Sequence, residues 1–225
     1  MTYIAAVAAV SLAAYIVGSL NSAIISVYLM KGKDIREYGS KNAGLTNVYR
    51  CFGPGCAAVT LIMDLAKGLI VVYGTKLGLF ASGLFSAEEH DVTAACLIAS
   101  VFAILGHVFP VFYRFKGGKG ILVGATCSLA INPIIFLLGI LTMVLAVAVT
   151  RYISIGSIAC CLGFPLFILI AEYFSGGISD NILIHMLLAG FMGILCIIRH
   201  VSNIRRLIDH TENKFTFKRD KSDKS

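Results

Sequence analysis

Two short polar loops carry the residue types best suited to binding anions in this 225-residue chain. The first loop is GSKNAGLTN at 39–47, and the second is RFKGGKG at 114–120. Closely spaced glycines let successive backbone N–H groups converge, and lysine or arginine adds positive charge. A helix that begins directly after such a loop adds the partial positive charge of its N-terminus. Both loops are therefore predicted to bind phosphate groups.

Several other chemistries lack the residues that they need. The second loop is not a nucleotide-binding P-loop, because Lys119 is followed by Gly120 rather than by Ser or Thr. None of the histidines has the aspartate that a His–Asp acyltransferase box requires, and no two histidines are spaced four apart as in a zinc-binding helix. No G-x-S-x-G nucleophile elbow occurs either. We expect neither a metal nor a cofactor.

The composition places these loops in a membrane protein. Hydrophobic residues make up 58% of the chain, mean hydropathy is +0.87, and charged residues are only 14%, whereas a soluble domain has about 25%. A bilayer core needs about 20 apolar residues as helix. The predicted membrane segments lie near 3–30, 52–80, 93–113, 120–131, 134–150, 153–174 and 181–198. Residues 120–131 are short for a crossing and could instead form a re-entrant piece.

These segments predict an all-α polytopic membrane protein with seven transmembrane helices. We expect a single membrane domain over residues 1–215, followed by a short charged C-terminal tail, 216–225, that is disordered. No basic residue precedes the first apolar run, so a cleaved signal peptide is not expected. The cysteines lie in or beside apolar segments, which favours small apolar side chains over a disulfide or metal framework.

The distribution of charge predicts the orientation. Apart from Lys67 and Lys76, every lysine and arginine lies in the loops near 31–50, 114–119 and 151 or in the segment from 199 onward. The other loops carry acidic residues: Glu88, Glu89, Asp91 and Asp180. By the positive-inside rule, the basic loops and the C-terminus are cytoplasmic and the N-terminus is outside. The anion-binding loops are thus expected at the cytoplasmic face.

Some polar residues fall inside the apolar segments. Asp64 and Lys67 are spaced three apart on one helix face, and we weigh a functional role about equally against mutual neutralisation. His107 is interpreted as a satisfied packing histidine, near the point where Pro110 should bend or end its helix. The segment RYISIGS, at 151–157, could also be an ordinary cytoplasmic loop.

The chain resembles the bacterial acyl-phosphate-dependent glycerol-3-phosphate acyltransferases from about Gly18 to Phe215. The motifs are GSKNAGLTNVYR, MDLAKG, GHVFPVFYRFKGGKG, RYISIGSI and RHVSNIRRLIDHTENKF. The resemblance implies a seven-helix enzyme of the bacterial inner membrane, with its active site on the cytoplasmic face. It implies transfer of an acyl chain from acyl phosphate to the 1-hydroxyl of glycerol 3-phosphate, giving lysophosphatidic acid and inorganic phosphate in phospholipid synthesis. Its partners would be these substrates and membrane lipids, with no nucleic acid, and a monomer is plausible.

The same resemblance implies two sets of site residues. The catalytic set is Lys119, His200, Asn203, Ser154 and Ser157. The substrate- and phosphate-binding set is Ser40, Asn42, Gly44, Thr46, Asn47, Arg50, Gly117, Gly118, Gly120 and Arg151. The family favours proton removal by the substrate's own phosphate, while His200 is the competing base, since its unperturbed pKa suits the task. The sequence leaves both routes open.

A few residues depart from the family pattern. Lys41 stands where glycine is usual, Leu45 where alanine is usual, and Ile121-Leu122-Val123 where Val-Ala-Thr is usual. A non-glycine residue resists positive φ, so Lys41 is expected to stiffen the first loop. These changes bear on substrate affinity more than on the reaction.

Two rival functions were weighed against acyl transfer. A transporter of a phosphorylated solute would have its site near the bilayer midplane, between broken helices or repeated halves. Here the polar clusters gather at one face, and the sequence has no evident repeat. A CDP-alcohol phosphotransferase would need clustered metal-binding aspartates, and Asp64 stands alone.

Overall fold

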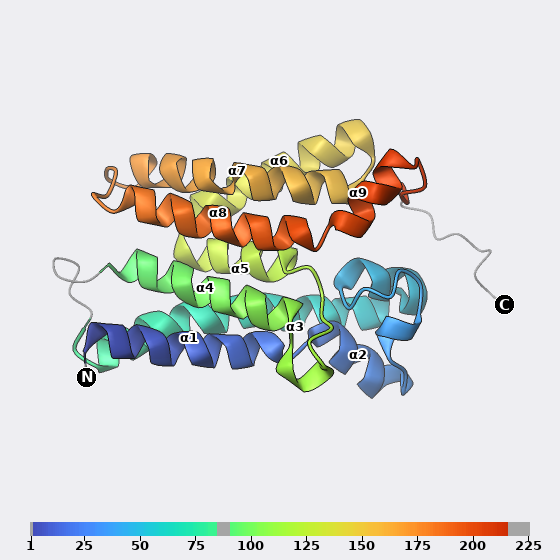
Figure 1. Ribbon diagram of the computed structural model, residues 1–225, viewed down its shortest axis with the longest axis horizontal. Helices are drawn as coiled ribbons and strands as arrows, with labels where there is room; N and C mark the ends of the chain where they lie inside the picture. The colour runs from blue at the N-terminus through green and yellow to red at the C-terminus, as the bar shows by residue number, and fades with distance from the viewer. Residues whose placement is uncertain (1, 85–90, 216–225) are drawn as a thin grey trace.

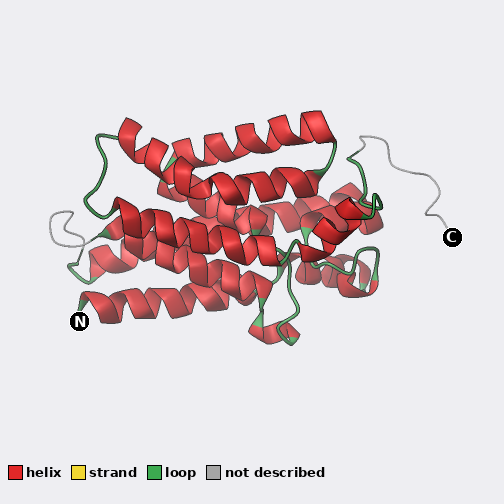
Figure 2. Cartoon of the chain, turned by 45° about the horizontal axis from the view of Figure 1, so that its top comes forward, coloured by secondary structure: helices red, strands yellow, loops and turns green. Residues whose placement is uncertain are grey.

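The computed structural model describes residues 2–84 and 91–215, and every regular element within these ranges is a helix (Figure 2). The predicted tail at 216–225 lies outside the described residues. The α-helices are α1 (Tyr3–Ser19), α2 (Ser22–Lys31), α3 (Leu45–Ala81), α4 (Val92–Val108), α5 (Ile121–Ile131), α6 (Pro133–Thr150), α7 (Ile153–Phe174), α8 (Ile182–Ile198) and α9 (Val201–Ile208). Two 3₁₀ turns join them: η1 (Ile35–Glu37) and η2 (Val111–Tyr113).

The long helices lie side by side in one bundle, and successive long helices run in opposite directions (Figure 1). Helix α1 packs on α4, α3 packs on α5, and α7 lies between α6 and α8. The N-terminus is at one end of the bundle, while α2, the start of α3 and α9 are at the other end (Figure 1). The polar loops predicted from the sequence are attached to this second end.

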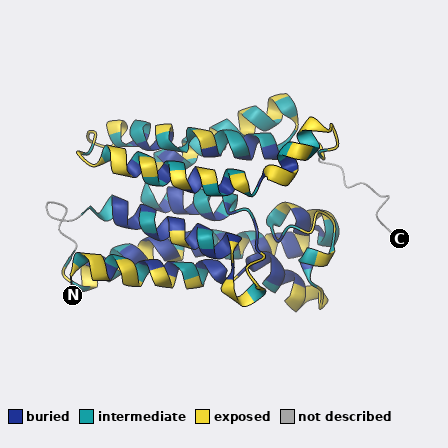
Figure 3. Cartoon of the chain, viewed as in Figure 1, coloured by how far each residue is buried: buried dark blue, intermediate teal, exposed yellow. Residues whose placement is uncertain are grey.

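The helices are apolar enough for a membrane. Within the described residues, five stretches are long and apolar enough to cross a bilayer: Tyr3–Lys31, α3, Val92–Tyr113, α6 and α7. Helix α8 adds a sixth if it is counted with α9, from which it is bent by 58°. Helix α6 is only 6% buried over its apolar window, and exposed residues cover the outside of the bundle (Figure 3). The all-α class is therefore confirmed for the described residues, and five or six helices are long and apolar enough to cross a membrane.

The structure moves several predicted boundaries. The segment expected at 3–30 breaks at Leu20, and the Asn21 side chain caps α2 by accepting the N–H of Ile24 at 3.0 Å. Helix α3 begins earlier than the expected residue 52 and is interrupted at Gly53, where φ is 80°. The following Pro54 has no N–H to donate, which accounts for the break. Helix α4 ends at Val108, just before Pro110 as predicted.

Glycines let neighbouring helices approach closely. A Cβ on Gly106 of α4 would lie 2.2 Å from the carbonyl oxygen of Tyr15 in α1. A Cβ on Gly18 of α1 would lie 2.2 Å from the carbonyl oxygen of Ala103. Small residues that allow backbones to meet are typical of helix pairs in membranes. The α1–α4 contact thus depends on both glycines.

The short length of α5 follows from the path of the glycine-rich loop. Gly118 and Gly117 donate their N–H groups to the carbonyls of His107 and Val108, at 3.1 and 3.2 Å. The loop therefore folds back along the end of α4 before α5 begins. At about 1.5 Å per residue, α5 then extends about 16 Å, which explains why the segment at 120–131 looked too short from sequence.

Candidate functional site

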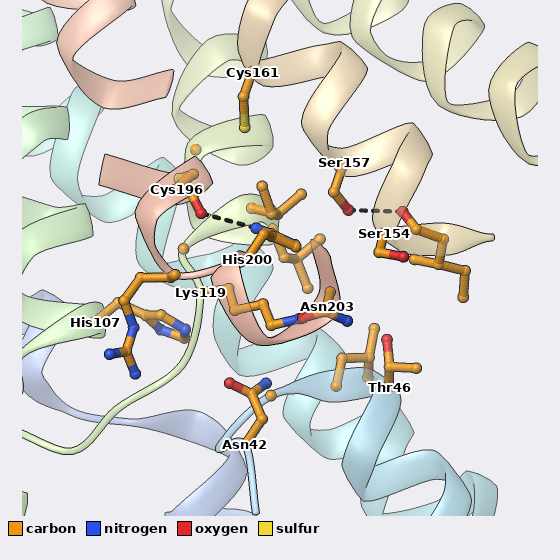
Figure 4. Close-up of a pocket in the computed structure, with 18 of the residues that line it drawn as sticks. Asn42, Thr46, His107, Lys119, Ser154, Ser157, Cys161, Cys196, His200 and Asn203 are labelled. Carbon is orange, nitrogen blue, oxygen red and sulfur yellow. Dashed lines mark hydrogen bonds between the residues drawn. The ribbon is translucent and has the colours of Figure 1, made fainter. Parts of the chain in front are cut away.

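A cavity of about 1080 Å³ collects segments that are far apart in the sequence. The first polar loop, the glycine-rich loop, the start of α7 and the turn between α8 and α9 all contribute to it. All but two of the predicted site residues line this cavity. The residues that line it are Ser40, Asn42, Gly44, Thr46, Asn47, Arg50, Gly117, Lys119, Gly120, Ser154, Ser157, His200 and Asn203. Figure 4 shows Lys119 extending toward Asn203, with Ser154 and Ser157 on α7 nearby.

The two exceptions are Gly118 and Arg151. Gly118 lies against the imidazole of His107, which does line the cavity, since a Cβ on Gly118 would meet His107 Nε2 at 2.2 Å. Arg151 ends α6 in the left-handed conformation, with φ 64°, and its carbonyl accepts the N–H of Phe215 at 2.6 Å. The structure therefore gives Arg151 a helix-terminating place beside the cavity wall.

Asn47 holds the first loop in shape. Its Oδ1 accepts the N–H of Ser40 at 3.0 Å, and its Nδ2 donates to the carbonyls of Tyr38 and Asn42 at 3.0 and 3.1 Å. Both the oxygen and the nitrogen of the Asn47 amide therefore form hydrogen bonds with the loop backbone, and the side chain is buried. Gly39 completes the fold, because it has φ 54° and a Cβ there would meet Asn47 Oδ1 at 2.5 Å.

Lys41 adopts the positive-φ backbone conformation that a non-glycine residue resists. Its φ is 59°, in the left-handed region, at the position where the family pattern has glycine. An L-residue in this region costs about 1 kcal/mol relative to the right-handed form. The side chain lines the cavity, so the substitution adds a cation to the site while straining the loop.

The glycine-rich loop delivers Lys119 to the cavity. Gly120 has φ 84° and directly precedes α5, so the segment expected from about residue 120 begins as a helix at Ile121. The ammonium of Lys119 donates a hydrogen bond to Asn203 Oδ1. Burial lowers the pKa of Lys119 to about 8, and Arg206 adds to this effect while Glu212 opposes it. Lys119 is therefore largely charged at neutral pH.

Glu212 is a cavity residue that the sequence analysis missed. Its carboxylate accepts hydrogen bonds from Asn203 Nδ2 at 2.7 Å and from Arg206 Nε at 2.6 Å. Burial alone would raise the pKa of Glu212, but these hydrogen bonds outweigh it and lower the pKa. Lys119, Asn203, Glu212 and Arg206 thus form one chain of contacts. Glu212 is one of two carboxylates, with Asp209, in the basic segment 199–215, and that was the available signal.

His200 is held as a neutral imidazole in the turn before α9. Its Nδ1 lies 2.8 Å from the carbonyl oxygen of Cys196, which can only accept, so Nδ1 carries the proton and Nε2 is an acceptor. Burial lowers the pKa of His200 to about 4, and the charge of Lys119 contributes. On α7, Ser157 donates its hydroxyl to the carbonyl of Ile153 at 3.0 Å (Figure 4).

Beyond its polar end, the cavity continues as an apolar groove between α5, α6, α7 and α8. The groove is lined by Leu122, Ile135, Phe136, Ile140, Met143, Phe164, Phe167 and Met192. A cationic end joined to an apolar groove suits an amphiphilic ligand with an anionic head. The arrangement could hold an acyl chain in the groove and phosphate groups against Lys119 and Arg50.

Comparisons with known proteins agree in sequence and in structure. The family model described as glycerol-3-phosphate acyltransferase matches residues 8–210. The glycerol-3-phosphate acyltransferase of Chlorobaculum tepidum is 38% identical over 94% of this chain and 97% of its own, and that of Chlorobaculum parvum is 38% identical over 92% and 95%.

Two solved structures also match. The crystal structure of PlsY (YgiH), an integral membrane glycerol 3-phosphate acyltransferase, in its glycerol 3-phosphate form gives a TM-score of 0.76 at 29% identity. That match covers 93% of this chain and 96% of the other. Its lysophosphatidic acid form gives 0.73 at 27% identity.

Proposed function

Because the chain belongs to the glycerol-3-phosphate acyltransferase family, we propose that it moves an acyl chain from acyl phosphate to the 1-hydroxyl of glycerol 3-phosphate. The products are lysophosphatidic acid and inorganic phosphate. The observation that carries this proposal is the single cavity in which a cation-lined end opens into an apolar groove. An acyl phosphate has the same two parts, an anionic head and a long apolar chain.

Two phosphate groups must come close together in this reaction. Two dianions about 5 Å apart repel by on the order of ten kcal/mol at an effective dielectric constant near 20. Lys119, Arg50 and Arg206 line the cavity and offset this repulsion, together with the N–H groups of the two glycine-containing loops. Preorganised charges of this kind supply much of the barrier reduction in many enzymes.

The bond changes need no protein nucleophile. The 1-hydroxyl oxygen of glycerol 3-phosphate attacks the carbonyl carbon of acyl phosphate, and the carbon–oxygen bond to phosphate breaks. The departing phosphate takes the electron pair, and the hydroxyl proton goes to the phosphate of glycerol 3-phosphate. A phosphate monoester with a second pKa of about 6 is a stronger base than His200, whose pKa is about 4. This difference favours the substrate phosphate over His200 as the proton acceptor.

The proposed setting is a bacterial inner membrane, crossed seven times by one domain over residues 1–215, with the N-terminus outside and the cavity open to the cytoplasm. The alternating direction of the helices supports this topology (Figure 1). The hydrogen bond from Asn132 Nδ2 to Ser175 Oγ, at 2.8 Å, ties the α5–α6 junction to the end of α7, which supports α5 as a crossing. Reporter fusions at the two termini test the orientation, and a cytoplasmic N-terminus would contradict it.

The choice of donor tests the proposed reaction. Purified protein receives labelled glycerol 3-phosphate with either palmitoyl phosphate or palmitoyl-coenzyme A, and lysophosphatidic acid is counted. We expect product with palmitoyl phosphate alone. Equal product from the thioester would contradict a site built around two phosphates.

A further inference from the structure

Three ionisable side chains are buried in the helices below the phosphate-binding loops. Asp64 and Lys67 lie on α3, His107 lies on α4, and their exposed fractions are 2%, 5% and 4%. Lys67 Nζ lies 3.2 Å from Asp64 Oδ1 and also 3.2 Å from Ser22 Oγ at the start of α2. The proposed reaction uses none of these groups. Ionisable residues inside a membrane helix are expensive, so their function needs an explanation.

His107 is only in part the satisfied packing histidine that the sequence suggested. Its Nδ1 is buried and has no hydrogen-bond partner among the described residues. The nearest carboxylate oxygen, Asp64 Oδ1, is 3.9 Å away, which places it beside the imidazole but is too far for a hydrogen bond. Asp64 and His107 both line the cavity. The packing part of the interpretation agrees with the burial of His107, whereas Nδ1 lacks the expected hydrogen bond among the described residues.

The glycine-rich loop is built directly on His107. The carbonyl of His107 accepts the N–H of Gly118 at 3.1 Å, and a Cβ on Gly117 would lie 2.0 Å from that same oxygen. The imidazole lies on the other side, since a Cβ on Gly118 would meet His107 Nε2 at 2.2 Å. Lys119 is the next residue in the chain. Any shift of His107 would thus move the backbone that carries Lys119.

The first loop approaches Gly118 from another direction. A Cβ on Gly118 would lie 2.6 Å from the carbonyl oxygen of Ala43, so that loop also contacts Gly118. Asn21 Nδ2 donates to the Ala43 carbonyl at 3.4 Å, and Ser22, its neighbour, contacts Lys67. The buried cluster therefore lies under both phosphate-binding loops at once.

We propose that Asp64 and His107 are positioning residues, which fix the glycine-rich loop against the first loop and so set the affinity of the cavity for glycerol 3-phosphate. Asp64 lies beside the imidazole at 3.9 Å, and Lys67 orients Asp64 through a hydrogen bond of 3.2 Å. The imidazole in turn supports Gly118 and the backbone at Lys119. This inference rests on the proposed acyl transfer.

The competing explanation is that Asp64 and Lys67 only neutralise each other. A double variant distinguishes the positioning role from mutual neutralisation, because replacing a buried ion pair by apolar residues of similar size often leaves folding intact. Asp64→Leu/Lys67→Met removes both charges and the carboxylate that faces His107. We expect its melting temperature to match that of the wild type, while its KM for glycerol 3-phosphate rises about tenfold or more. Asp64→Asn/Lys67→Met keeps an oxygen facing His107 and should bring KM back to within about threefold.

Lys76→Met is the matched control, because Lys76 also lies on α3 but contacts the carbonyl of Ala130, far along the helix from the loops. Its KM should stay at the wild-type value. A wild-type KM in Asp64→Leu/Lys67→Met would overturn the inference. If that double variant does not fold, His107→Leu takes its place, and an unchanged KM there would overturn the inference equally. Absence of turnover in the wild-type protein would instead contradict the proposed reaction.

Discussion

At the scale of single residues, the cavity concentrates its charge on a few side chains that are half-buried and joined by hydrogen bonds. Lys119 donates to Asn203, and Asn203 donates to Glu212, which also accepts from Arg206. Glu212 thus offsets part of the positive charge while orienting the amide that meets Lys119. A phosphate would have to compete with this carboxylate for the same cations.

Removing the charge of Lys119 should abolish most catalysis. We expect Lys119→Ala to insert and fold with a near-normal melting temperature but to lose about 100-fold or more in kcat/KM, the size of effect seen when one preorganised charge-stabilising group is lost. Lys31→Ala is the control, since Lys31 is exposed at the end of α2. Turnover like that of the wild type in Lys119→Ala would remove this lysine from the mechanism.

The pH dependence of kcat/KM should report two groups. Lys119 has a pKa of about 8, so its charge is present below that pH and the rate should fall as pH rises through it. If the substrate phosphate accepts the proton, its dianion is needed, and the rate should also fall as pH drops through about 6. A rate that stays level down to about pH 4, the pKa of His200, would identify His200 as the base instead.

At the scale of elements, glycines decide how the helices meet. We expect Gly106→Ala to force α1 and α4 apart, because the added Cβ would lie 2.2 Å from the backbone oxygen of Tyr15. Overpacking of this kind costs about 1–3 kcal/mol, measured as a lower melting temperature in detergent. Gly74→Ala on α3 is the control, since a Cβ there meets nothing within 4 Å. A stable Gly106→Ala variant would show that the α1–α4 contact is loose.

The sequence predicted the helical class, the glycine-rich loop and part of the polar lining of the cavity, because composition and short motifs carry that information directly. It did not predict the break at Gly53 or the break before Asn21, since local polar caps and positive φ leave little trace in an apolar run. It also missed Glu212 and expected His107 to be fully hydrogen-bonded. The roles of both depend on contacts between segments that are distant in sequence, which periodicity cannot register.

The backbone conformation at Arg151 was also not predicted from the sequence. The resemblance implied a binding role for Arg151, which stays a prediction, and the structure adds that the chain turns at this residue, with φ 64° and its carbonyl bonded to Phe215. Conversely, the doubt over Lys41 was well founded, because φ at Lys41 is indeed positive. A residue that replaces a family glycine can be expected to have a positive φ, whereas the direction of a long side chain cannot be predicted from the sequence.

At the scale of the whole molecule, the bundle has many exposed apolar side chains and a cavity with a polar end. The apolar groove between α5 and α8 lets a chain remain in a lipid-like environment while its head reaches the loops.

The most direct test of the account follows both products of the reaction together. Purified protein in lipid, without added metal, receives palmitoyl phosphate and glycerol 3-phosphate, and inorganic phosphate and lysophosphatidic acid are measured over time. The account predicts equal amounts of the two, dependent on glycerol 3-phosphate. Phosphate release without lysophosphatidic acid, or no product from folded protein that binds glycerol 3-phosphate, would contradict it.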